Sequence, residues 1–320
     1  MGTTNTRLWV VNDGSIVERI SEQVGLRDAA RERNKSLVRD ALRALIAAAR
    51  TMATQRNLQA ECVLAAGMLT SPLGLCEVPH IPAPAGEREL VQSLHKFTDG
   101  EVTDLPIYLV PGIRTGALAP SLEDLDQTDL LRGEETVIVG LLQTQILPPG
   151  ATLLNLGSHW KAIRIDEQFR IASSYTTLSG ELIHALQAQT VLASALPQGR
   201  FDELDLEWLE RGRRFQNSSG MGRSLFSVRL LEQIYHVGPL ALSSFLLGAI
   251  VESDLRSMEK AKQLKDPIVI TGAGAAARAW QSILQTTGRT SKLCDSEIVE
   301  QAFVQGLVRL LNLRTTQHLR

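Results

Sequence analysis

Short apolar runs that stop at glycine or proline recur along the chain and predict buried β-strands. The clearest is Leu153-Leu154-Asn155-Leu156, which follows Pro148-Pro149-Gly150 and ends at Gly157. We expect strands here and at three comparable runs, residues 62–66, 106–110 and 267–270.

Apolar residues with a helical period predict the helices. In the segment 34–54 these residues recur one turn apart, and Arg39, Arg43 and Arg50 fall on the opposite face. The polar segment 115–130 reads as a surface loop. Strands mixed with helices in this way are typical of α/β proteins. Further helical patterns cover residues 131–142, 181–196, 222–235, 241–258 and 297–311.

A β-hairpin is predicted close to the N-terminus. Leu8-Trp9-Val10-Val11 and Ser15-Ile16-Val17 flank the turn residues Asn12-Asp13-Gly14, which is a strong hairpin pattern. The preceding Gly2-Thr3-Thr4-Asn5 would usually join two strands, and only the second of them follows here. We expect either that this turn is the true terminus or that an upstream strand is missing.

Two turns rich in glycine and hydroxyl residues follow the strand at 153–156. The first is Gly157-Ser158-His159-Trp160-Lys161, and the second is Thr176-Thr177-Leu178-Ser179-Gly180-Glu181-Leu182. Backbone N–H groups in such turns can face an anion. Ordinary β-turns and helix caps have the same composition, so each turn alone leaves both interpretations open. Two such turns, with a third similar segment at 2–5, favour a phosphate site.

A Gly-x-Gly turn follows the strand at 267–270. Thr271-Gly272-Ala273-Gly274 leads into an apolar helix, a pattern that nucleotide-binding proteins use. Tight turns also use glycine for geometry alone, so the pattern is weak by itself. The chain lacks GxxxxGK(S/T), which excludes the P-loop class. It also lacks a GxGxxG with an acidic residue about twenty positions on, which argues against an NAD domain.

Composition narrows the class of protein. With 320 residues the chain is long enough for two domains, and 44% hydrophobic and 21% charged residues are ordinary for a soluble protein. A net charge of −2 gives no indication of nucleic-acid or membrane-surface binding. The three cysteines, Cys62, Cys76 and Cys294, lack CxxC spacing, so structural zinc and a disulfide framework are not expected. Without an 18-residue apolar run or a signal-peptide pattern, a cytoplasmic location is expected.

The segment Arg132-Gly133-Glu134-Glu135 opens the helix predicted at 131–142. Carboxylates in a first helical turn stabilise the helix through its macrodipole, so the two glutamates can be simple caps. An arginine and two glutamates outside an apolar strand also resemble a substrate-binding corner. Both interpretations stay open.

These segments together resemble the 2-dehydro-3-deoxygalactonokinases. The likeness covers nearly the whole chain in the same order. It is carried by Gly2-Thr3-Thr4-Asn5-Thr6-Arg7, Ala66-Gly67-Met68, Arg132-Gly133-Glu134-Glu135-Thr136, Leu156-Gly157-Ser158-His159-Trp160-Lys161 and Ser179-Gly180-Glu181-Leu182.

The resemblance implies an α/β fold of two actin-like (ribonuclease H-like) domains around a central cleft. Residues 1–146 would form an N-terminal domain with most of the sugar-acid contacts. Residues 147–320 would form a C-terminal domain with the turn at 157–161, which is the family's second phosphate turn, and the nucleotide site. The implied reaction is ATP-dependent phosphorylation of 2-dehydro-3-deoxy-D-galactonate at its 6-hydroxyl in D-galactonate breakdown, with ATP and Mg²⁺ as cofactors. A homodimer is left open.

The resemblance also implies roles for individual residues. The catalytic candidates are Glu134, Glu135 and His159, and no residue is assigned to the metal. The residues expected at ATP are Gly2, Thr3, Thr4, Asn5, Gly157, Ser158, Lys161, Gly272 and Gly274. Those expected at the sugar acid are Gly67, Met68, Thr70, Ser71, Arg132 and Glu181.

The chain departs from the family pattern at two places. The family's first motif is Asp-x-Gly-Thr-Thr-Asn after an apolar strand; here Met1 takes the x position, and the Asp and the strand are absent. At the turn around residues 157–161, which corresponds to the family's second phosphate turn, Leu156 and Ser158 replace Pro and Thr. A non-catalytic binding homologue, or a kinase for another acid sugar, therefore stays open. We expect the natural protein to begin about eight residues upstream, the length of one strand with its flanks.

Overall fold

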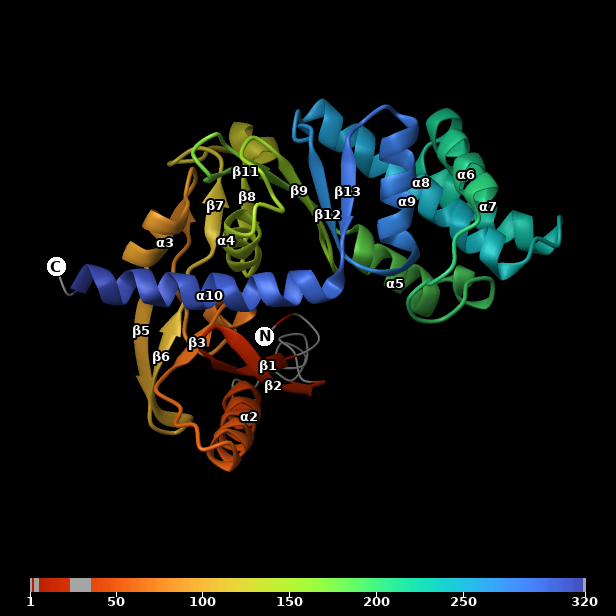
Figure 1. The fold of residues 1–320 in the computed structure, drawn as a ribbon. Coiled ribbons are helices and arrows are strands. Elements are labelled where there is room, and N and C mark those ends of the chain that lie inside the picture. The colour runs from red at the N-terminus through yellow and green to blue at the C-terminus, as the bar shows by residue number, and fades with distance from the viewer. Residues whose placement is uncertain (1, 3–5, 24–35, 319–320) are drawn as a thin grey trace. The chain divides into compact units, whose positions relative to one another are not determined.

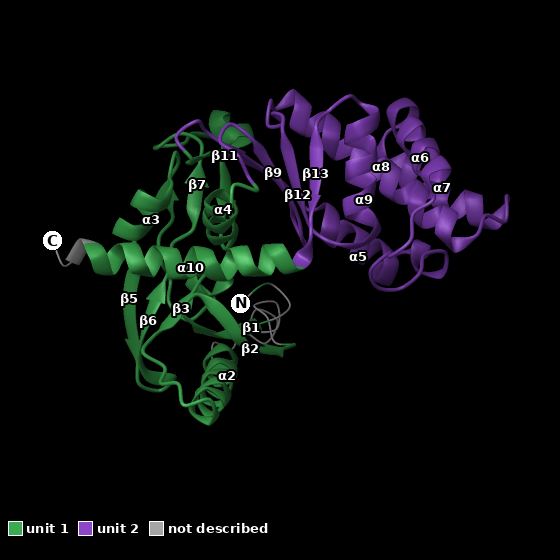
Figure 2. Cartoon of the chain, viewed as in Figure 1, with its two compact units in different colours: residues 1–146, 169–172, 297–320 green, residues 147–168, 173–296 purple. Residues whose placement is uncertain are grey.

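A computed structural model describes residues 2, 6–23 and 36–318 of the chain (Figure 1). The chain divides into two compact units (Figure 2). Unit 1 contains Met1–Ile146, Phe169–Ala172 and Glu297–Arg320, and unit 2 contains Leu147–Gln168 and Ser173–Ser296. Both units combine β-sheets with helices, so the predicted α/β class is confirmed.

Unit 1 begins with the predicted hairpin. Strands β1 (Thr6–Asn12) and β2 (Ser15–Glu22) pair antiparallel, and the turn residues Asp13 and Gly14 have positive φ angles of 48° and 76°. Within the described part of the chain, β1 pairs with β2 alone.

Two small sheets complete the β-structure of unit 1. One has the order β3-β6-β5, with bounds Val63–Ala65, Thr103–Leu109 and His95–Asp99. Helix α2 (Ser36–Gln55) buries Val38, Leu42 and Ile46 in a core shared with residues of β3 and β6. The other sheet has the order β4-β7-β8, with bounds Ile81–Pro82, Ile113–Thr115 and Asp129–Leu131.

The segment 115–130 was expected to be a plain loop, and the structure corrects this. Strands β7 and β8 pair antiparallel across it, and the 3-10 helix η2 (Leu122–Gln127) lies between them. The same pairing shortens the helix predicted from residue 131, because Leu131 pairs with Ile113 as the end of β8. Helix α4 therefore begins at Glu134 and ends at Gln143. Helix α3 (Glu87–Gln92) and the 3-10 helix η1 (Gly67–Thr70) complete this part of the chain.

The last helix, α10 (Ser296–His318), was expected in the C-terminal domain, but almost all of it belongs to unit 1. Close backbone contact explains the assignment. A Cβ atom on Gly140 of α4 would lie 1.9 Å from the carbonyl oxygen of Ala302. The Trp9 indole of β1 also donates a 2.7 Å hydrogen bond to Glu300, and its ring packs on Phe303.

Unit 2 is built on a sheet of order β11-β10-β9-β12-β13. Strand β12 lies parallel to both β9 and β13, and β9 and β10 form an antiparallel hairpin. The predicted strands at 153–156 and 267–270 are thus confirmed as β9 and β12. The bounds are Thr152–Leu156 (β9), Trp160–Ile165 (β10), Ile171–Thr177 (β11), Ile268–Thr271 (β12) and Ser291–Cys294 (β13).

The helices of unit 2 share an apolar core with this sheet. Leu246 and Ile250 of α8 pack in one cluster with Trp160 and with Trp280 of α9. The sequence pattern did not predict helix α6. Its many charged residues interrupt the apolar positions that pack on α8. The helices are α5 (Ser179–Gln189), the 3-10 helix η3 (Val191–Ser194), α6 (Leu206–Ser219), α7 (Met221–Gln233), α8 (Pro239–Lys260) and α9 (Gly274–Thr286).

Candidate active-site residues

The two hydroxyl- and glycine-rich turns of unit 2 lie against each other. A Cβ atom on Gly180, in the first turn of α5, would lie 2.2 Å from the carbonyl oxygen of Gly157 and 2.6 Å from that of Ser158. The backbone N–H of Glu181 donates a 2.8 Å hydrogen bond to the Ser158 carbonyl. Gly157–Ser158, which we call the phosphate turn after the role expected of it, thus packs against the start of α5 in a backbone arrangement that only glycine permits at residue 180.

Three polar side chains lie at or beside the phosphate turn. Ser158 Oγ lies 3.4 Å from His159 Nδ1, and His159 Nε2 lies 3.9 Å from Glu181 Oε1. The side chains of His159 and Glu181 each keep about one third of their surface exposed. A hydroxyl, an imidazole and a carboxylate are thus gathered within one accessible region of unit 2.

Lys161 lies one residue into β10, directly opposite Asn155 of β9, which in turn lies opposite Thr271 of β12. Opposed residues share a sheet face, so these three side chains form one row. Thr271 donates a 2.9 Å hydrogen bond to the Asn155 side chain. Lys161 is only 8% exposed, so the aliphatic part of its side chain is buried and does not lie along the protein surface.

The Gly-x-Gly turn before α9 begins at the same end of the sheet. Parallel strands β9 and β12 end at Leu156 and Thr271, and Gly272 follows with a φ of 143°. A Cβ atom on Gly272 would lie 2.8 Å from Cβ of Leu156, so this turn packs against the end of β9. Gly274 has a φ of 74°. In open α/β sheets ligands bind beyond the carboxyl ends of the strands, which is where these turns lie.

Asp254 of α8 is a buried residue that the sequence did not single out. Its Oδ2 accepts hydrogen bonds of 2.7 Å from Thr177 and 2.6 Å from Ser179. Burial raises the pKa of Asp254, and the two hydroxyl hydrogen bonds oppose the rise. No distinct sequence signal marks it, because α8 also contains Glu252, Arg256 and Glu259.

In unit 1 the segments Gly67–Ser71 and Arg132–Glu135 meet. Gly67 and Gly133 have positive φ angles of 80° and 114°, and a Cβ on Gly133 would lie 3.2 Å from Cα of Gly67. Thr70 and Ser71 are buried, and their hydroxyls donate to the carbonyls of Gly67 and Met68 at 3.0 and 2.8 Å. Met68 is half-buried.

The Arg132 guanidinium joins three parts of unit 1. It donates to the carbonyl and the hydroxyl of Thr70, and at 3.4 Å to the carbonyl of Val78. Its Nη2 also lies 3.2 Å from His80 Nδ1, a partner that the sequence did not reveal. Burial lowers the pKa of Arg132, and the nearby carboxylates Glu135 and Glu77 oppose this. Arg132 therefore shapes the loop around Thr70 and Val78 through protein contacts.

The two glutamates differ in exposure. Glu134 is half-buried, and its Oε2 accepts a 2.9 Å hydrogen bond from the backbone N–H of Arg132. Glu135 is fully buried, and both of its oxygens lie 2.8 Å from the backbone nitrogen of Gly133. The carboxylate of Glu135 thus holds the Gly133 turn, whereas Glu134 keeps access to solvent.

Four of the residues expected at ATP lie at the N-terminus. Gly2 is exposed, and Thr3, Thr4 and Asn5 lie outside the described residues.

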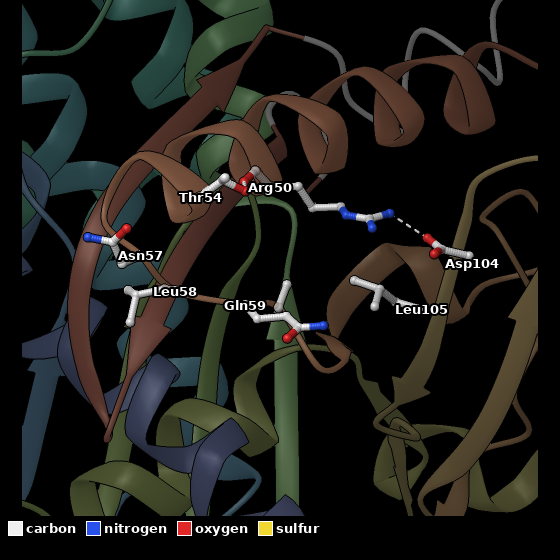
Figure 3. A pocket seen from close by; sticks show the side chains of 8 residues that line it. Arg50, Thr54, Asn57, Leu58, Gln59, Asp104 and Leu105 are labelled. Carbon is white, nitrogen blue, oxygen red and sulfur yellow. Dashed lines mark hydrogen bonds and ion pairs between the residues drawn. The ribbon is translucent and has the colours of Figure 1, made fainter.

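A surface hollow of unit 1 contains none of the predicted site residues. Arg50 and Asp104 pair within it. Its lining is Arg50, Thr54, Asn57, Leu58, Gln59, Ala60, Asp104 and Leu105 (Figure 3).

The described part of the chain has neither a cluster of metal-binding side chains nor a helix suited to cross a membrane. It contains no group of three or more His, Cys, Asp and Glu side chains able to hold a metal ion. Mg²⁺ that binds with a nucleotide needs only one or two carboxylates, because phosphate oxygens and water complete its shell. The carboxylate of Glu181, which lies at the phosphate turn and is about one third exposed, fits that need. None of the described helices is long and apolar enough to span a membrane.

Comparison with known proteins defines the class of enzyme. Residues 1–310 match the model of a kinase family described as DGOK, 2-keto-3-deoxy-galactonokinase. The protein is therefore an enzyme of the kinase class, which implies ATP as phosphoryl donor. The chain belongs to the 2-keto-3-deoxy-galactonokinase family, whose substrate is also named 2-dehydro-3-deoxygalactonate.

One solved structure agrees with this assignment at the level of the fold. The chain is similar to a candidate 2-dehydro-3-deoxygalactonokinase protein from Sinorhizobium meliloti, with a TM-score of 0.76, 19% identity and coverage of 98% of this chain and 96% of that one. A weaker similarity links it to the activator of the 2-hydroxyisocaproyl-CoA dehydratase from Clostridium difficile with bound ADPNP. There the TM-score is 0.49, the identity 11% and the coverage 100% and 96%, which is too weak to support an inference. No curated protein matches the chain.

Proposed function

We propose that this kinase transfers the terminal phosphoryl group of ATP to the 6-hydroxyl of 2-dehydro-3-deoxy-D-galactonate in the breakdown of D-galactonate. The family match over residues 1–310 carries the proposal. We assign most of the sugar-acid contacts to residues of unit 1, and the turn at 157–161 and the nucleotide site to residues of unit 2. We place the enzyme in the cytoplasm, and the homodimer left open by the sequence stays a prediction that a native mass measurement tests.

The phosphate turn of unit 2 is proposed to hold the ATP phosphates. Ser158 supplies a hydroxyl, and Lys161 and His159 supply positive charge or hydrogen-bond donors. Gly272 and Gly274 let the backbone come close to the nucleotide. Glu181 would help to hold a Mg²⁺ ion that enters with the nucleotide, and such an ion would supply neutralisation of the phosphate charge. Phosphoryl transfer depends mainly on such positioning and charge neutralisation.

In unit 1 we propose that Gly67–Ser71 and the Arg132–Glu135 turn form the sugar-acid site. Arg132 fixes the Thr70 and Val78 carbonyls in place and sets positive charge beside them for the carboxylate of the substrate. Glu134, the more accessible of the two glutamates, acts as general base toward the attacking hydroxyl. Glu135 holds the Gly133 turn and has no direct part in proton transfer.

ADP release with a panel of sugar acids tests the proposal. 2-Dehydro-3-deoxy-D-galactonate should support turnover with the highest kcat/KM, and mass spectrometry of the product should place the phosphate on carbon 6. Higher kcat/KM with another acid sugar would reassign the substrate. Binding of ATP and the sugar acid without ADP formation would favour a non-catalytic homologue.

Replacing Arg132 by Lys should raise KM for the sugar acid and leave KM for ATP nearly unchanged. A lysine ammonium cannot span the Thr70 and Val78 carbonyls as the guanidinium fork does. Loss of a charge-assisted hydrogen bond should cost about 1.5–3 kcal/mol, or roughly 10- to 100-fold in KM. Arg39→Lys is the control, because Arg39 lies on α2 and pairs with Asp99 of β5. An unchanged KM for the sugar acid would remove Arg132 from the substrate site.

Ser158→Ala should lower kcat about tenfold, because the loss of one hydrogen bond to a charged phosphate is worth roughly 1.5 kcal/mol. His159→Ala should also lower kcat. Ser158→Thr should be tolerated, since it keeps the hydroxyl and restores the residue usual in the family. Steady-state kinetics that were unchanged in Ser158→Ala would reduce this segment to an ordinary β-turn.

A further inference from the structure

A buried carboxylate in unit 2 connects two segments next to the phosphate turn. Asp254 is 7% exposed, and its Oδ2 accepts from both Thr177 and Ser179. Thr177 is the last residue of β11, and Ser179 is the first residue of α5. Leu178 lies between them and makes no side-chain capping hydrogen bond to α5. The carboxylate of Asp254 is therefore a side-chain group that links the end of β11 to the start of α5.

The contacts continue from Asp254 to the phosphate turn. Ser179, which is 6% exposed, donates to Asp254 at 2.6 Å. The next residue, Gly180, lies against the carbonyls of Gly157 and Ser158, and Glu181 donates its N–H to Ser158. A shift of Ser179 would therefore move the backbone that supports the phosphate turn.

We propose that Asp254 is a positioning residue for ATP: it fixes the start of α5 against the phosphate turn and so sets the geometry in which the phosphates bind. The proposal rests on the assignment of ATP to that turn. Asp254 itself contacts neither substrate and acts through Ser179 and the first turn of α5.

The positioning role depends on the hydrogen bonds that Asp254 accepts and not on its charge. Burial raises the pKa of Asp254 above its value in the unfolded chain, so the ionised form costs free energy in the folded state above the folded pKa. This cost disappears below the unfolded pKa, where both states are protonated. Asp254→Asn removes the cost at neutral pH, and its carbonyl oxygen can accept both hydroxyl protons because both reach a single oxygen of Asp254. The melting temperature of Asp254→Asn at pH 7 should therefore equal or exceed that of the wild type.

The test compares Asp254→Ala, Asp254→Asn and Ser179→Ala in steady-state kinetics with ATP and 2-dehydro-3-deoxy-D-galactonate, together with thermal melting. Ser179→Ala, which loses one hydrogen bond to a charged group, should lower kcat/KM for ATP about tenfold, and Asp254→Ala, which loses two, should lower it at least as much. KM for the sugar acid should change less than about twofold. Asp254→Asn should restore kcat/KM for ATP to within about threefold of the wild type.

Thr152→Val is the matched control. Thr152 is a fully buried hydroxyl residue that bonds the backbone of Lys265 at the opposite end of β9. The Thr152→Val substitution should lower the melting temperature without changing kcat/KM for ATP. Equal loss of kcat/KM for ATP in Thr152→Val and Asp254→Ala, or no loss in Asp254→Ala, would overturn the inference.

Ser158→Ala separates this inference from the proposed function. A loss in Ser158→Ala with none in Asp254→Ala would overturn the role of Asp254 and leave ATP at the phosphate turn. Wild-type kinetics in both variants would overturn the assignment of ATP to the turn, and the inference with it.

Discussion

Replacing Glu134 by Gln is expected to lower kcat by about two to four orders of magnitude, the usual contribution of a general base. Glutamine removes the proton acceptor but keeps a carbonyl oxygen that can accept from the N–H of Arg132, as Glu134 does at 2.9 Å. The turn before α4 should therefore keep its structure. KM for both substrates and the melting temperature should stay close to those of the wild type, and rapid-mixing kinetics should show that the chemical step has slowed.

Glu135→Gln is the matched comparison. Its carboxylate is fully buried and takes the backbone N–H of Gly133 with both oxygens. This variant should lose stability, by about 1–3 kcal/mol for a weakened buried hydrogen bond, and lose less kcat than Glu134→Gln. If Glu134→Gln kept kcat within tenfold of the wild type, the base would be another group, with His159 the next candidate to test.

Gly180→Ala should reduce kcat/KM for ATP by about a hundredfold, because a displacement of roughly 1 Å at a reacting group can cost that much. The added methyl would lie 2.2 Å from the Gly157 carbonyl and 2.6 Å from that of Ser158. Both are backbone atoms, so the phosphate turn itself must move. Overpacking of this kind also destabilises, typically by about 1–3 kcal/mol.

Gly212→Ala tests whether the loss is specific. Gly212 of α6 has the same constraint, since a Cβ there would lie 2.0 Å from the carbonyl of Phe245 in α8. It should destabilise unit 2 by a similar amount while the folded fraction keeps wild-type kinetics with ATP. Gly222→Ala, with nothing within 4 Å, should be neutral in both measurements. If Gly180→Ala and Gly212→Ala lowered kcat/KM for ATP equally, the effect would be one of stability and not of the phosphate turn.

Local signals in the sequence located most of the elements that carry the candidate site. The apolar run before Gly157 is β9, and the Asn12-Asp13-Gly14 turn forms the predicted hairpin. The glycines of the turns in the candidate site have backbone angles that explain the choice of residue, because Gly133 and Gly272 adopt φ angles that other residues rarely reach. Element ends were less certain. The helix expected over 181–196 ends at Gln189, where Thr190 caps the separate helix η3 through a 3.1 Å hydrogen bond from Leu192.

The sequence by itself determined the α/β class, the kinase family and the segments in which phosphate and sugar-acid residues were expected, because these features depend on local periodicity and short motifs. Only the tertiary structure decided which of them meet. The contact of Gly180 with Gly157, the burial of Glu135 in contrast to Glu134, and the bond from Ser179 to Asp254 all join or separate residues through packing. The place of α10 in unit 1 was decided in the same way, by the close approach of Gly140 to Ala302. Such long-range contacts follow from the free energy of the whole packed unit, and no short stretch of sequence encodes them.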